Sequence, residues 1–141
     1  MRVMVIVRAD TVSESGEMPS GKMLADMGRF NEELAKAGVL VSADGLRPSS
    51  AGALLRFSNG ASSVARGPLV DASVAGFWLW RVDSLDEAIE WASKAPFENA
   101  AVELRPVMEA QDCGKADAPE LQHQPLDTRE QLERFTGIET S

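Results

Sequence analysis

Short apolar runs alternate along the chain with two stretches of helical spacing. Residues 2–8, 39–46 and 75–82 are short runs rich in apolar side chains, and this pattern predicts three strands. Residues 22–37 place apolar side chains three and four positions apart, which predicts an amphipathic helix that stops at Gly38. The stripe expected to face the core consists of Met23, Leu24, Met27, Phe30, Leu34 and Ala37.

Turn signals predict a hairpin in the middle of the chain and a second helix after it. Residues 53–67 contain an Asn-Gly pair, which supplies the positive φ angles of a two-residue hairpin turn. Ser84 and Glu87 have the spacing of a capping box, which predicts a helix over residues 85–95. The inward stripe of this helix should consist of Leu85, Ala88, Ile89 and Ala92.

The remaining segments are assigned by polarity. Residues 11–21 are polar and rich in turn formers, so we expect a loop there. Residues 100–109 follow the second helix and read as a last strand. We expect one domain over residues 1–110, followed by a polar C-terminal arm, residues 111–141, with a short helix at 129–135.

The order of these elements predicts an α+β fold: strand, helix, strand, hairpin, strand, helix, strand. Two strand–helix–strand units give a ferredoxin-like antiparallel sheet with both helices on one face and an inserted β-hairpin. The other face of the sheet should still carry Val, Trp and Leu side chains that need a cover. A second copy of the chain is the economical cover, so we expect a homodimer.

Charge and composition exclude several classes of protein. Hydrophobic residues make up 44% and charged residues 26% of the chain, as in ordinary globular proteins. The net charge of −8 and the lack of a basic run argue against nucleic-acid binding. With one cysteine, Cys113, and one histidine, His123, neither an internal disulfide nor a Cys/His zinc site is expected. No signal peptide or membrane span is apparent, so we expect a cytoplasmic protein that does not bind membranes.

Several segments together resemble a known family. They are AGVLVSADGLRPSSAG, RGPLVDA, GFWLWRVDSLDEAIEWASKAP and VELRPVMEA, with the helix at 22–37, and they span residues 1 to about 112. In wording and order they resemble the YCII-related, or DGPF-domain, proteins. The resemblance implies a dimeric ferredoxin-like α+β barrel with a cleft near the dimer interface. It implies no activity, although some members are associated with sigma-factor systems.

The motif that names the family, Asp-Gly-Pro-Phe, is only partly present. This chain keeps Gly67 and Pro68 but has Arg66 in place of the Asp and Leu69 in place of the Phe. Asp71 falls on the position of the acid that follows the motif. The better-known YCII branch resembles an enzyme through a His-Asp pair in its cleft, and that pair has no counterpart here, because the histidine of this chain lies in the C-terminal arm.

Charged residues near the expected strand ends are the first candidates for a site. Asp44 ends the second strand, where a carboxylate could act as a base or anchor a ligand, or simply serve a turn. Arg47 and Arg66 could converge with Asp71 to bind a carboxylate or phosphate. The alternative for the last two residues is a surface ion pair that contributes little to stability.

Aromatic residues are the second group of candidates. Trp78 and Trp80 share one side of their strand, where they could stack on a flat ligand or pack in the core or a dimer interface. Cys113 is a lone thiol in a polar segment beside an acid, Asp112, which disfavours a nucleophilic role. Ser49 and Ser50 do not lie in a nucleophile elbow, and no metal-ligand or cofactor motif occurs.

Three functions remain open on these residues. The first is a homodimeric protein that binds a small anionic or aromatic ligand in a cleft near the dimer interface. The second is a small YCII-type hydrolase or lyase that uses Asp44 or Asp71 as its acid or base and needs no cofactor or metal. The third is an accessory protein in sigma-factor-linked transcriptional regulation, with its acidic surface and C-terminal arm as contact sites.

Overall fold

The computed structural model describes residues 1–71 and 74–113 of the chain. These residues belong to two compact units, Met1–Val107 and Met108–Ser141. The described part of the second unit contains a short 3-10 helix, η2 (Ala110–Cys113). The expected helix at residues 129–135 and His123 lie outside the described residues. The sheets and the α-helices described below belong to the first unit.

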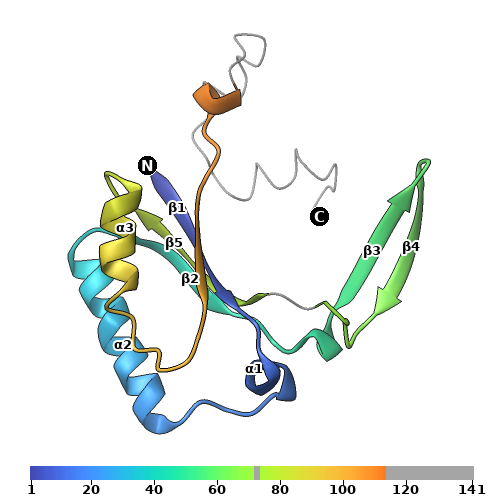
Figure 1. Cartoon of the computed structure of the whole chain (residues 1–141), viewed down its shortest axis with the longest axis horizontal. Coiled ribbons are helices and arrows are strands. Elements are labelled where there is room, and N and C mark those ends of the chain that lie inside the picture. Colours follow the sequence, from blue (N-terminus) through green and yellow to red (C-terminus); the bar gives the residue numbers. More distant parts are fainter. Residues whose placement is uncertain (72–73, 114–141) are drawn as a thin grey trace, which may run out of the picture. The chain divides into compact units, whose positions relative to one another are not determined.

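A four-stranded antiparallel sheet organises the first unit (Figure 1), with the strand order β2-β5-β1-β6. The bounds of the strands are β1 (Arg2–Arg8), β2 (Leu40–Gly45), β5 (Val74–Arg81) and β6 (Val102–Pro106). Helices α2 (Gly21–Lys36) and α3 (Leu85–Ala92) lie on the same side of the sheet. Each helix connects two parallel strands that are separated by one antiparallel strand. This arrangement is ferredoxin-like, so the expected α+β class is confirmed.

The core lies between the sheet and the two helices because alternate residues of the central strands point that way. Val3 and Val5 of β1 and Trp80 of β5 are 0% exposed. The helices contribute two aromatic or aliphatic side chains from α2 and one alanine from α3. These are Phe30, Leu34 and Ala88, all of them buried in the same cluster.

The opposite face of the sheet differs from expectation in one respect. Both tryptophans of β5 point toward the helices, so the open face carries no Trp side chain from this strand. Its centre consists instead of Met4 opposite Leu79 and Ile6 opposite Phe77, paired across β1 and β5. All four are partly exposed in the single chain. The open face is therefore apolar at its centre, as expected, but with different residues.

Helix α2 follows the predicted periodicity closely. Its N-cap is Ser20, whose hydroxyl accepts a hydrogen bond from the Met23 amide at 3.1 Å. Phe30 and Leu34 are buried, but Leu24 is 56% exposed, so the first turn of the predicted stripe does not reach the core. The helix is followed by Gly38, with a φ of 75°, as the glycine stop predicted.

Helix α3 begins as predicted, but the residues that face the core are not those of the predicted inward stripe. The Ser84 hydroxyl accepts from the Glu87 amide at 3.1 Å, while the Glu87 carboxylate accepts from the amide of Asp83 at 2.8 Å, one residue before the cap. Ile89 is 47% exposed, so its predicted inward position is wrong. The residues that pack against the core from this segment are Ala88, Trp91, Ala92 and Ala95.

One short helix was not predicted at all. Residues 11–21 were expected to be a loop, but α1 (Thr11–Ser15) forms there. Asp10 caps it, because its carboxylate accepts from the Ser13 amide at 2.8 Å and the Ser13 hydroxyl accepts from the Asp10 amide at 2.9 Å. Gly16 ends it with a φ of 78°. Local side-chain hydrogen bonds hold this single turn, and it has no apolar stripe. Hydrophobic spacing therefore could not predict it.

The predicted hairpin is confirmed as β3 (Ala53–Ser58) and β4 (Ala61–Arg66). Its turn has φ angles of 50° at Asn59 and 82° at Gly60, which an Asn-Gly pair tolerates. Every residue of both strands is exposed. A two-stranded ribbon gains little from its own contacts, so the anchoring at its base determines how firmly it is held.

The base of the hairpin is tied to α1 through one serine. The Glu14 carboxylate accepts bonds from the amide of Ser49 at 3.1 Å and from its hydroxyl at 2.6 Å. The same hydroxyl accepts from the Leu69 amide at 2.9 Å. The amide of Gly67 donates to the Gly52 carbonyl at 2.9 Å and closes the base.

We expect Gly67→Ala to lower the free energy of unfolding by about 1–3 kcal/mol. A Cβ at Gly67 would lie 1.7 Å from the Ser49 carbonyl oxygen, so backbone would have to move. Gly52→Ala is the matched control, because its Cβ would lie 3.5 Å from that same oxygen, an ordinary contact. Urea unfolding gives the free energy, and amide exchange over residues 53–66 reports the hairpin itself. Equal effects of the two substitutions would contradict the steric explanation.

Candidate functional site

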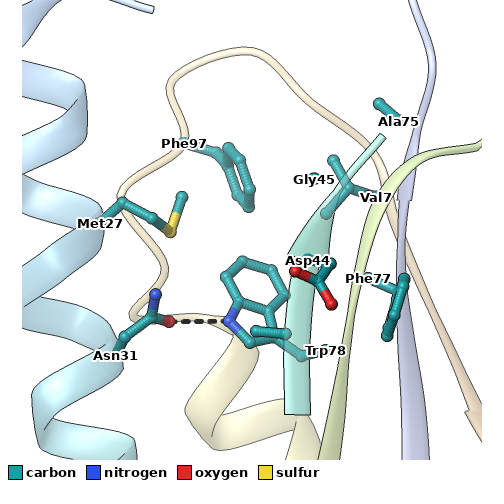
Figure 2. Close-up of a pocket in the computed structure, with 11 residues that line it drawn as sticks. Val7, Met27, Asn31, Asp44, Gly45, Ala75, Phe77, Trp78 and Phe97 are labelled. Atoms are coloured by element: carbon teal, nitrogen blue, oxygen red, sulfur yellow. Dashed lines mark hydrogen bonds between the residues drawn. The ribbon is translucent and has the colours of Figure 1, made fainter. Parts of the chain in front are cut away.

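A pocket of about 350 Å³ lies between helix α2 and the adjoining ends of β2 and β5 (Figure 2). Most of its wall is apolar, and three aromatic residues line it. The lining residues are Val7, Met27, Asn31, Ala43, Asp44, Gly45, Ala75, Gly76, Phe77, Trp78 and Phe97. Volume and composition are those of a small-molecule site, in which apolar walls surround a few polar groups.

Trp78 forms both a wall of this pocket and part of the core. Its side chain is 5% exposed. The ring meets Phe30 edge-on at a centroid distance of 5.8 Å and Phe97 at 6.0 Å, geometries that aromatic pairs favour. Figure 2 shows Met27 and Phe97 on the same side of the strands as Trp78, while Phe77 lies on the other side. The apolar part of the wall is thus held in place by core packing.

Asn31 fixes the orientation of the Trp78 indole. The indole Nε1 donates to Asn31 Oδ1 at 2.8 Å. Since an indole nitrogen only donates, the accepting atom of the amide must be the oxygen. The amide nitrogen is then turned away from the indole, and Figure 2 shows it on the side of Met27.

Asp44 is the charged residue among those that line the pocket. It is exposed, it stands next to the end of β2, and its backbone pairs with Phe77 of β5. The two strands approach closely there, because a Cβ at Gly76 would lie 3.1 Å from the Asp44 carbonyl oxygen. The close approach therefore brings the backbone of this strand end to the pocket, while the pairing with Phe77 places the Asp44 side chain on the open face of the sheet.

A second pocket of about 460 Å³ lies at the base of the hairpin. Its wall includes two arginines and one carboxylate, and its rim is open, with Val70 98% exposed. The lining residues are Leu54, Arg56, Ala65, Arg66, Pro68, Leu69, Val70 and Asp71. Among the described residues, neither Arg66 nor Asp71 takes part in an ion pair, so the surface pair considered for them is not formed.

The six candidate site residues from the sequence are divided by the fold. Asp44 and Trp78 line the first pocket, whereas Arg66 and Asp71 line the second. Arg47 is exposed and lines neither of them, and Trp80 is 0% exposed within the core. The expected single cleft with arginines, acids and tryptophans together is therefore not formed by one chain.

The sequence analysis named two of the eleven pocket residues as site residues and missed the other nine, among them Met27, Asn31 and Phe97. Met27 had been assigned to the core stripe, and Asn31 stands four positions later on the same helix face. A polar side chain at that spacing on an apolar stripe was the available signal. Phe97 follows Pro96, after the end of α3, and α3 itself contributes no residue to the pocket. Nothing in the local sequence pattern around Phe97 indicated a site.

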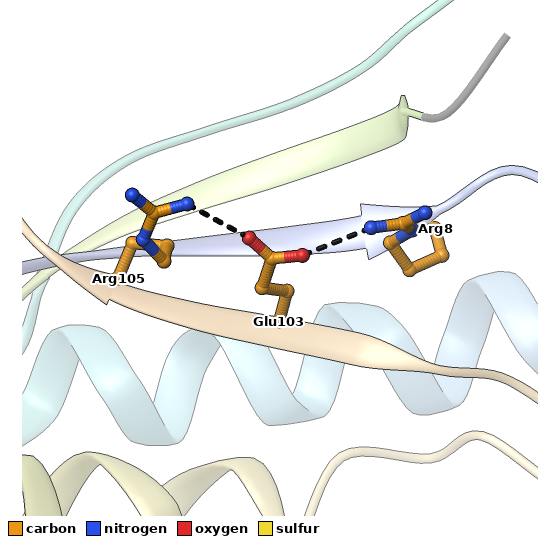
Figure 3. Close-up of polar contacts among 3 residues, drawn as sticks. All are labelled: Arg8, Glu103 and Arg105. Carbon is orange, nitrogen blue, oxygen red and sulfur yellow. Dashed lines mark hydrogen bonds and ion pairs between the residues drawn. The ribbon is translucent and has the colours of Figure 1, made fainter. Parts of the chain in front are cut away.

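Apart from the two pockets, a cluster of three charged side chains lies on the open face of the sheet (Figure 3). Glu103 of β6 accepts from Arg8 of β1 at 2.9 Å and from Arg105 at 3.1 Å. The hydrogen bond from Arg105, and then that from Arg8, hold the pKa of Glu103 below its usual range. Strand register places this cluster beside Met4 and Ile6. The cluster borders the apolar centre of the open face and does not line either pocket.

Over residues 1–71 and 74–113, no three His, Cys, Asp or Glu side chains gather as metal ligands would. Within the same residues, no helix has the length and apolar character needed to cross a membrane.

Fold and pocket together define a ferredoxin-like α+β domain with a small-molecule-sized pocket between a helix and its sheet. The model of the YCII-related domain family matches residues 1–111. The chain therefore belongs to the YCII-related domain family, as the resemblance of its motifs indicated. A comparison with curated proteins gave no match.

We expect Asn31→Leu to lower the free energy of unfolding by about 1–2 kcal/mol, because it leaves the buried Trp78 N–H without an acceptor. Asn31→Asp keeps an oxygen at this place and should retain most of the stability. Urea unfolding followed by tryptophan fluorescence measures both. In a Trp78→Phe background, the cost of Asn31→Leu should shrink, since no indole donor remains. An unchanged cost would show that Asn31 acts through other contacts.

Proposed function

We propose that this domain binds a small, flat, largely apolar molecule in the pocket between α2 and the ends of β2 and β5. The observation that carries the proposal is the pocket itself: about 350 Å³, with Trp78 and Phe97 in its wall and the Asn31 amide beside Trp78. Flat apolar ligands gain from ring contacts of this kind, since aromatic faces and edges attract one another beyond simple burial.

The rigidity of the wall supports binding further. Trp78 is held by its bond to Asn31 and by edge-on packing against Phe30, so its ring does not need to be ordered when a ligand enters. A preorganised wall lowers the entropic cost of binding. The pocket is thus suited to hold a ligand with little rearrangement of the protein.

The alternative of a hydrolase or lyase finds less support. An acid–base reaction needs a carboxylate beside a second group that moves the proton or holds the substrate. Asp44 has no arginine among the residues that line its pocket. Asp71 lines the second pocket with Arg56 and Arg66, at the exposed base of the hairpin and apart from the aromatic wall. The regulatory alternative depends largely on the C-terminal arm, most of which lies outside the described residues.

Binding is tested by nuclear magnetic resonance with indole and 2-naphthol as probes. We expect the Trp78 side-chain N–H signal to shift as either probe is added, because that indole lines the pocket. Trp91 is the internal control: it lies on α3 with Lys94 Nζ 4.9 Å from its ring centre and does not line the pocket. A Trp78→Phe variant assigns the signal. Equal shifts of both signals, or none, would contradict the proposal.

The open face of the sheet supports a second proposal, a homodimer formed through that face. Its centre is made of Met4, Ile6, Phe77 and Leu79, and the Arg8–Glu103–Arg105 cluster stands at its border. An apolar centre with a polar rim is the usual composition of a protein interface. A second copy would remove these side chains from water, which is the dominant favourable contribution to association.

Light scattering after size exclusion tests the dimer. We expect about twice the chain mass of 15.2 kDa for the wild type and the monomer mass for Leu79→Glu, which places a charge at the centre of the face. Met18→Glu is the matched control, because Met18 is 79% exposed and lies in the loop before α2. Circular dichroism checks that both variants fold. A wild type of monomer mass at micromolar concentration would overturn this proposal.

A further inference from the structure

We propose that the first pocket selects a flat aromatic molecule with a hydrogen-bond acceptor at its edge, and that the missing side chain of Gly45 makes room for the ring. This inference rests on the proposed binding function and defines its ligand class. Two features on the helix side of the sheet carry it. One is the free amide nitrogen of Asn31, and the other is a floor without side chains between β2 and β5.

The amide of Asn31 presents a hydrogen-bond donor to the pocket. Its oxygen accepts from Trp78 Nε1 at 2.8 Å, so the amide nitrogen is the atom turned away from the indole. Figure 2 shows this nitrogen on the side of Met27, which also lines the pocket. Among the described residues, the nitrogen donates no hydrogen bond. A ligand that covers it without offering an acceptor leaves the donor unpaired, which weakens binding.

Strand register places a floor without side chains next to Trp78. Gly76 stands two residues before Trp78 in β5, so it faces the helices as the indole does. Its partner across the strands is Gly45 of β2, and directly paired residues of antiparallel strands face the same side. Both glycines line the pocket. The carboxylate of Asp44, one residue earlier, lies on the open face and does not reach this floor.

The two glycines of the floor differ in what a side chain would meet. A Cβ at Gly76 would lie 3.1 Å from the Asp44 carbonyl oxygen, so this glycine permits the close approach of the strands. A Cβ at Gly45 would meet no atom within 4 Å beyond its chain neighbours, and the backbone there is part of a strand. Neither packing nor backbone conformation therefore requires a glycine at position 45. Its absent side chain leaves space on the pocket side for a ring.

A matched series of three probes tests the acceptor, because indole, indazole and benzimidazole share one fused-ring shape and are uncharged in neutral buffer. Indole offers a donor only. Indazole and benzimidazole each replace one ring C–H by an acceptor nitrogen, at different places on the ring. We expect at least one of these two to bind about fivefold more tightly than indole, as one net hydrogen bond would give. Titrations followed by the Trp78 side-chain N–H signal measure the dissociation constants.

A variant of Asn31 separates the hydrogen bond from the different hydrophobicity of the probes. Asn31→Asp keeps an acceptor for Trp78 and removes the amide donor, so the advantage of the acceptor-bearing ring over indole should be lost. Asn59→Asp is the control, because it makes the same change at the exposed turn of the hairpin, where Asp-Gly is tolerated as well as Asn-Gly. This control should keep the advantage.

A variant of Gly45 tests the floor. Gly45→Val should weaken all three probes by about tenfold or more, because its side chain occupies the space of the ring. Gly45→Ala adds less volume and should weaken them less. The free energy of unfolding in urea should not fall in either variant, since nothing lies within reach of the new Cβ. Ser58→Val, the same side chain at the exposed end of β3, is the control and should leave binding unchanged.

The outcomes distinguish the ligand class from the pocket function. If neither acceptor-bearing ring is favoured over indole, or if Asn31→Asp keeps their advantage, the acceptor requirement is wrong while the pocket still binds. If both Gly45 variants bind the probes as the wild type does, the ring does not lie on the glycine floor and that part of the inference is overturned. If neither these probes nor 2-naphthol shifts the Trp78 signal, the proposed binding function itself fails.

Discussion

The alternation of side chains along β5 is the constraint on which the core and the pocket both depend. Because β5 pairs with β1 on one side and β2 on the other, its residues contact every layer of the domain. Trp78 and Trp80 point to the helices, where each ring meets Phe30. The same alternation sends Phe77 and Leu79 to the open face. One strand thus supplies the core, one pocket wall and the surface proposed as a dimer interface.

The two tryptophans show what the sequence could and could not predict. Their shared side of the strand followed from the period of two, and so did the strand itself. Their different surroundings did not. Trp78 Nε1 donates to Asn31 of α2, whereas Trp80 Nε1 is buried with no hydrogen-bond partner in the described residues. That difference depends on which helix residue lies over each ring. The local sequence pattern of the strand does not predict how the helices pack against it.

The same reason explains why the fold divides the candidate residues between two pockets. Asp44 and Arg47 are three positions apart in the sequence, yet only Asp44 lines the first pocket. Arg66 and Asp71 line one pocket, as their sequence proximity suggested, but Asp44 lines the other. The reason is that β2 lies at the edge of the main sheet while the hairpin forms a sheet of its own. Local signals such as the Ser84 cap were predicted correctly since they depend on neighbours within one turn.

The partly preserved family motif is best understood by what its residues contact. Gly67 and Pro68 are kept, and Gly67 has a steric reason independent of any chemistry, because the Ser49 carbonyl occupies the space of a side chain there. Leu69 replaces an aromatic residue, but the contact that it makes to the Ser49 hydroxyl uses its backbone amide, which any residue but proline supplies. Arg66 replaces the acid and lines the second pocket. The contacts found at the motif hold the base of the hairpin, so its preserved part is structural, while the pocket suited to a ligand is formed by α2, β2 and β5.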